Sequence, residues 1–138
     1  MIDVSRAIFD RLTGSPDLAA LISTYASAPA IFTATPIPAD ATYPIIVSSG
    51  NVSDSSSDNK TGRGREITRD VFVYAEEVSS ASSVEEIAGT VLNLLRVAPL
   101  TVPEGIAIVL GVNGPIEVDA PDGFQGRALT VRLLVEEV

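Results

Sequence analysis

The sequence predicts an α+β fold in which a mostly antiparallel sheet of four to five strands carries helices packed on one face. Two observations support this prediction. Apolar residues recur at helical spacing near the N-terminus and again after residue 83, while segments of alternating apolar and polar residues precede and follow that second region. The 138 residues show no internal repeat and no shift in composition, so we expect a single domain over residues 1–138.

Two short helices are expected at the N-terminus. The first follows Asp3, a suitable N-cap, and ends at Gly14. The second begins at Ser15-Pro16-Asp17, which supplies a capping hydroxyl, a proline in the first turn and an acid at the positive end of the helix dipole. The apolar residues expected on the buried sides are Val4, Ala7, Ile8, Leu12, Leu18, Leu21 and Ile22.

The segment from Tyr25 to Tyr43 is rich in proline, which a helix or a central strand does not tolerate. We expect a loop that either lies over the core or packs against another subunit. The apolar residues Ala30, Ile31 and Phe32 are candidates for that second role.

A short buried strand is expected at residues 44–47, followed by a long flexible hairpin loop at about 48–65. That loop contains six Ser and three Gly, a composition that buries little apolar surface. It also holds Lys60, Arg63 and Arg65, three of only nine basic residues. The loop therefore combines expected mobility with the clearest cluster of positive charge.

The next strand covers residues 67–75, where Ile67, Val71, Val73 and Ala75 face one way and Thr68, Asp70, Phe72 and Tyr74 the other. Arg69 interrupts the apolar face, so we expect it near the start of the strand or paired with an acid.

The strongest helix signal covers residues 84–96. Ser82 and Ser83 each precede a glutamate by three residues, which is the spacing of a capping box. Gly89 is unfavourable in mid-helix, and close approach of the helix to the strands would explain it. The helix stripe consists of Val84, Ile87, Ala88, Val91 and Leu95.

The C-terminal third reads as strands. We expect a strand at 105–110, a turn at 111–115, a strand at 116–119, a turn at 121–123 and a closing strand whose apolar side is Leu129, Val131, Leu133 and Val135.

Composition excludes several classes of function. The chain has no His and no Cys, which removes Ser–His and Cys–His catalysis, thiolate metal sites and disulfides. A net charge of −9 argues against tight binding of nucleic acid. No apolar run approaches the roughly 20 residues that span a bilayer, and no secretory signal precedes the first helix. We therefore expect no enzyme, no cofactor, no metal and no membrane contact.

The remaining polar motifs are weak. Residues 54–59 resemble a calcium loop but lack its glycine and its bidentate glutamate. Residues 61–65 form a glycine-rich turn without the lysine–serine ending of a phosphate loop. The paired glutamates, such as Glu76 and Glu77, are adjacent in sequence and are best explained as solvated charges.

Four segments, taken in chain order, resemble the small tail-completion proteins of long-tailed phages. They are SPDLAALI at 15–22, YPIIV at 43–47, RDVFVYA at 69–75 and RALTVRL at 127–133. The Ala- and Pro-rich stretch between residues 25 and 40 departs from the shorter link that is usual there.

The resemblance implies a tail terminator, which forms a ring, typically a hexamer, on the finished tail tube and presents a surface for head attachment. Its implied partners are copies of itself, the tail tube protein and a head-completion or connector protein, and DNA would pass through without specific binding. The implied location is the head-proximal end of a phage or gene-transfer-particle tail, after assembly in the host cytoplasm. For contacts between copies, we expect the basic residues Lys60, Arg63 and Arg65 to meet acidic Glu76 and Glu77.

Three other functions stay open at this point, one of which is an unrecognised enzyme that an activity screen would reveal. A head-completion or connector ring protein differs from a terminator only in its binding partner. A small-molecule-binding regulatory module would instead be a compact monomer or dimer with a closed apolar pocket.

Overall fold

A computed structural model describes residues 4–25, 27–33, 42–48, 51–56, 64–76, 84–96, 100–102, 105–120 and 123–137. Within this part of the chain the helices are α1 (Val4–Thr13), α2 (Pro16–Ala19) and α3 (Val84–Arg96). The strands are β1 (Thr24–Tyr25), β2 (Ala28–Pro29), β3 (Ile31–Phe32), β4 (Ile45–Val47), β5 (Asn51–Ser56), β6 (Gly64–Glu76), β7 (Leu100–Val102), β8 (Gly105–Val118) and β9 (Phe124–Glu137).

One seven-stranded sheet dominates the fold, in the order β3-β4-β6-β9-β8-β7, with β5 also paired to β6. Strands β3 and β4 are parallel and the other pairs of this sheet are antiparallel. The α+β class is therefore confirmed, but the prediction of four to five strands was too low. Short strands β3, β5 and β7 come from segments that lack a clear alternating pattern, and pairing with longer neighbours makes them strands.

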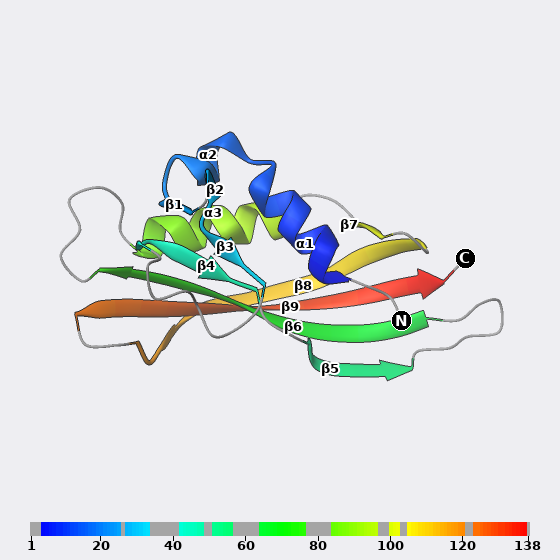
Figure 1. The fold of residues 1–138 in the computed structure, drawn as a ribbon. Coiled ribbons are helices and arrows are strands. Elements are labelled where there is room, and N and C mark those ends of the chain that lie inside the picture. Colours follow the sequence, from blue (N-terminus) through cyan, green and yellow to red (C-terminus); the bar gives the residue numbers. More distant parts are fainter. Residues whose placement is uncertain are drawn as a thin grey trace.

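The three helices lie on one side of the sheet (Figure 1). The main hydrophobic core fills the space between them and the sheet. It joins the apolar stripe of α3 and the buried side of α1 to the inward-facing residues of β6 and β9, all of which are less than 9% exposed. These inward residues include Ile67, Val71, Val73, Leu129, Val131 and Leu133, as the alternation predicts.

Both predicted N-terminal helices form, although α2 ends at Ala19, before the predicted Leu21 and Ile22, and the predicted cap Asp3 lies outside the described residues. Helix α1 ends one residue before Gly14, and the Ser15 hydroxyl accepts a hydrogen bond from the Leu18 amide at 3.3 Å to cap α2. Leu18 and Ile22 are buried, while Leu21 is partly buried against the same core. Helix α3 spans the predicted residues, so its boundaries are confirmed, while its predicted caps Ser82 and Ser83 lie outside the described residues.

Two predicted loops are strands instead. Residues 51–56 form β5, paired with β6 from Arg65 to Arg69, so the predicted loop at 48–65 is interrupted by a strand. Residues 111–115, predicted as a turn, continue β8 across two register shifts. At the second shift Gly114 has φ of +105°, and a Cβ there would lie 2.7 Å from the Ala128 carbonyl oxygen. The glycine therefore bends the strand without ending it.

Two predictions about single residues are corrected in part. A Cβ placed on Gly89 would meet no atom within 4 Å. Close approach of α3 to the strands therefore does not explain this glycine. Arg69 is 3% exposed, and its guanidinium donates hydrogen bonds to the Ser48 side chain at 3.4 Å and to the Ser48 carbonyl at 3.1 Å. A backbone carbonyl and a hydroxyl thus help to hold this buried charge.

Candidate functional site

Six of the chain's seven aromatic residues gather on the face of the sheet that carries no helix. Strand register explains this placement, because Phe72 and Tyr74 alternate along β6 with the buried Val71, Val73 and Ala75. All six side chains are half-buried. We call this group the aromatic patch: Tyr25, Phe32, Tyr43, Phe72, Tyr74 and Phe124.

The rings of the aromatic patch contact one another in pairs. Tyr25 and Phe32 meet edge to face with centroids 5.5 Å apart. Tyr43 and Phe124 lie at 4.4 Å, which links the segment before β4 to the start of β9. Phe72 and Tyr74 are nearly parallel at 6.2 Å. Below the rings, Ala30, Ile45 and Val47 are buried and form a second, smaller core.

Gly126 makes room for the centre of the patch. It lies between Tyr74 and Val118 across three strands, and a Cβ there would come within 3.0 Å of both side chains. The Tyr74 ring can therefore lie against the backbone of β9. Burial, and secondarily the neighbouring Tyr43 phenol, raise the pKa of Tyr74 above its ordinary value.

The helix-free face also exposes aliphatic residues of β8. Ile116 is 59% exposed and Ile108 is 38% exposed, the large hydrophobic residues most open to solvent in the described part of the chain. Ile116 lies in the same cross-strand row as Ala128 and Phe72. It therefore extends the apolar surface of the patch toward the sheet edge.

The other half of this face is polar. Arg132 pairs with Glu66 across β9 and β6 with a closest N–O distance of 2.6 Å. The Thr130 hydroxyl donates to the Asp70 carboxylate at 2.8 Å. The helix-free face is thus divided along its strands into an aromatic half and a half of paired polar groups.

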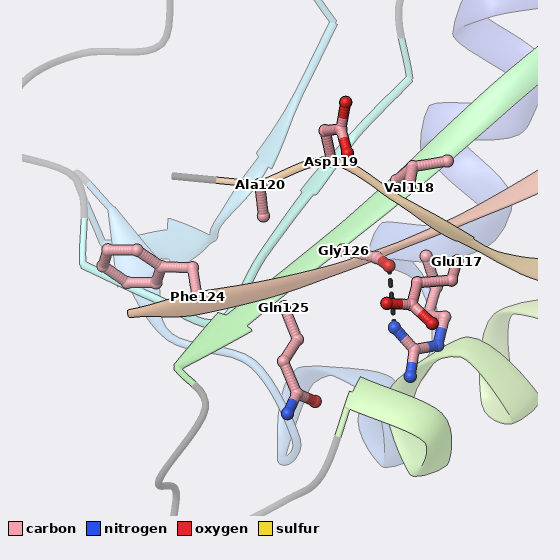
Figure 2. A pocket seen from close by; sticks show the side chains of 8 residues that line it. Glu117, Val118, Asp119, Ala120, Phe124, Gln125 and Gly126 are labelled. Atoms are coloured by element: carbon pink, nitrogen blue, oxygen red, sulfur yellow. Dashed lines mark hydrogen bonds between the residues drawn. The ribbon is translucent and has the colours of Figure 1, made fainter. Parts of the chain in front are cut away.

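A hollow of about 250 Å³ lies at the end of the β8–β9 pair and borders the patch through Phe124 (Figure 2). Glu117 and Gln125 point to the side on which α3 is seen, whereas Asp119 points the other way. Arg127 also lines the hollow, and its guanidinium donates to Glu85 and to the Gly126 carbonyl. The hollow has acidic groups on both sides and a positive charge that is already paired.

The structure separates the residues predicted for contacts between copies. Ala30 and Ile31 are buried within their own subunit, on opposite faces of the sheet, because β3 joins its edge. Only Phe32 of that trio keeps a half-exposed side chain. Glu76 is exposed at the end of β6. Arg65 lies at the opposite end of the same strand, and Lys60, Arg63 and Glu77 lie outside the described residues.

The described side chains offer little for catalysis. In this part of the chain no group of three or more acidic residues is arranged to hold a metal ion. No helix in the same residues is long and apolar enough to cross a membrane.

Sequence reasoning missed the aromatic patch. The alternation in β6 does place Phe72 and Tyr74 on the outer face, and this was the available signal. The other four rings come from β1, β3, the residue before Pro44 and β9, and only the tertiary fold brings them together.

Comparisons with known proteins agree with this architecture. A search of curated proteins gives no match. A chain from a solved structure titled "Virion of native gene transfer agent (GTA) particle" has the same fold, with a TM-score of 0.78 at 20% identity over 96% of this chain and 94% of that one. Residues 6–136 match the family described as tail completion protein gp17. The chain therefore belongs to the tail completion protein gp17 family, whose members are structural proteins of phage tails.

Proposed function

We propose that this protein forms a ring, hexameric in the assembled particle, that ends the tail tube and provides the surface for head attachment. The family match over residues 6–136 carries this proposal, since it covers almost the whole chain. The fold shared with a chain of a gene transfer agent virion supports it. In this role the protein is non-catalytic and works by its surfaces alone.

The proposed partners are further copies of the chain, the tail tube protein and a head-completion or connector protein. The ring sits at the head-proximal end of the tail after assembly in the host cytoplasm. DNA crosses its channel without specific binding, and a net charge of −9 suits this, because acidic surface repels phosphates. A ring also needs a contact in which one patch meets a different patch on the next copy.

Deletion of the gene in its parent particle tests the function. We expect tails of uncontrolled length that lack heads, which electron microscopy of purified particles would show. Restoring the wild-type gene in trans is the control and should return normal lengths. Tails of normal length that carry heads in the deletion strain would contradict the proposal.

A connector role predicts a different phenotype. If the protein belonged to the head side of the joint, its loss would leave tails of normal length, free of heads. The same micrographs therefore separate the two functions.

A further inference from the structure

Two exposed carboxylates lie at one end of the aromatic patch. Glu76, at the end of β6, pairs in register with Phe124 and so lies on the same face, and Asp119, beyond the end of β8, points away from α3. The basic residue of this region, Arg127, is paired with Glu85. Partly exposed aromatic rings beside carboxylates favour an arginine or lysine, which gains cation–π contact and ionic attraction together.

The chain itself contains few cations for such a surface. Arg6 pairs with Asp10, Arg132 pairs with Glu66, and Arg69 is buried against Ser48. Arg11 donates to the Leu94 carbonyl at 3.0 Å. The other basic residues of the sequence are Arg96, which is exposed on α3, and the cluster of Lys60, Arg63 and Arg65.

That basic cluster and the aromatic patch belong to opposite ends of the sheet. Strand β5 ends and β6 begins at one end, where Ser56 pairs with Arg65, while β6 reaches Glu76 at the other (Figure 1). Eight residue steps along β6 separate Gly64 from Phe72, the patch residue of this strand that lies nearest to it, which is about 26 Å. The seven residues between Ser56 and Gly64 are tied at both ends, so the middle of this segment can lie at most about 14 Å from either end. The basic cluster therefore cannot reach the aromatic patch of its own chain.

We propose that the aromatic patch, with Glu76 and Ile116 at its border, receives the basic segment 60–65 of a second copy. This inference rests on the proposed ring and names its contact. Because donor and acceptor lie at opposite ends of one strand, each copy uses both surfaces, and the contact is heterologous, as a ring requires. Ile116, with 59% of its surface exposed, supplies apolar area that such a contact covers.

Cysteine pairs test the contact, because the chain has no Cys of its own. Particles are prepared with Ile116→Cys and Arg63→Cys in the same chain and treated with a short bis-maleimide. We expect a ladder of covalent oligomers on denaturing gels. The matched control is Ile108→Cys with Arg63→Cys, since Ile108 is also exposed on β8 but lies beside Leu134, in the polar half. This control should stay monomeric.

Chains that carry a single cysteine test whether the contact is heterologous or symmetric. Cross-linking between two Ile116→Cys chains would mean a symmetric pair and would overturn the proposal. Equal ladders from the 116/63 and 108/63 pairs, or no ladder from either, would overturn it as well.

A charge exchange gives a second readout. Glu76→Lys should reduce the number of head-bearing particles at least tenfold, and adding Lys60→Glu and Arg63→Glu should restore part of the loss. Arg96→Glu, added instead, should restore nothing. Rescue by Arg96→Glu, or no rescue by the Lys60/Arg63 exchange, contradicts the contact.

The two proposals fail separately. If deletion of the gene gives long, headless tails while cross-links and charge rescue are absent, the ring function stands and the docking site is wrong. If the deletion strain makes normal particles, the function itself is wrong.

Discussion

The two faces of the sheet are built from the same strands but from different kinds of residue. Toward the helices, β6 and β9 present branched aliphatic side chains such as Val71, Val73 and Leu133, with essentially no exposed surface. On the opposite face the same strands present Phe72, Tyr74 and Phe124, all of which remain half-exposed. The first face stabilises the fold, whereas the second leaves part of its aromatic surface in contact with water.

Adjacent leucines test this difference directly. Leu133 is fully buried under the helices and Leu134, on the other face, is only partly buried. We expect Leu133→Ala to lower the free energy of unfolding by about 2–5 kcal/mol, because it leaves a cavity in the main core. Leu134→Ala should cost about 1 kcal/mol, since less apolar surface is removed from a packed site.

Urea denaturation of the two variants measures both values. Ile87→Ala, at the helix side of the same core, should match Leu133→Ala. Equal losses at positions 133 and 134 would mean that the two faces contribute alike to stability.

A substitution in α3 tests how this helix packs on the sheet face that carries the helices. Gly89 lies on the helix without a neighbour near its missing Cβ, so Gly89→Ala should raise the free energy of unfolding by about 0.5–1 kcal/mol through helix propensity alone. Thermal unfolding followed by circular dichroism would show the increase. A decrease would indicate a close contact at this glycine after all.

The smallest expected effect concerns the helix-free face. It is a dependence of the free energy of unfolding on pH. The raised pKa of Tyr74 means that the folded state favours the neutral phenol. Its contribution to stability is fully present below the pKa of the unfolded chain, about 10, and is lost as the pH rises through the higher folded-state pKa. Unfolding measured between pH 8 and 11 should show a steeper loss for the wild type than for Tyr74→Phe. An identical loss of stability with pH in the two proteins would contradict this contribution of Tyr74.

Much of the covered face could be predicted from sequence, because its signals are local. The cap at Ser15, the glycine stop after α1, the stripe of α3 and the alternation of β6 and β9 each lie within a few neighbouring residues. The same periods that form each element also select its buried side, and so the main core follows from them.

The open face was decided by the tertiary structure. Long neighbouring strands turned residues 51–56 and 111–115 into strands, since backbone groups at a sheet edge gain hydrogen bonds that local propensity does not report. The aromatic patch joins residues from 25 to 124, and Gly126 is necessary there only because a tyrosine of another strand lies on it. The sequence therefore determines which aromatic residues are present, while the register between distant strands determines that their rings come into contact.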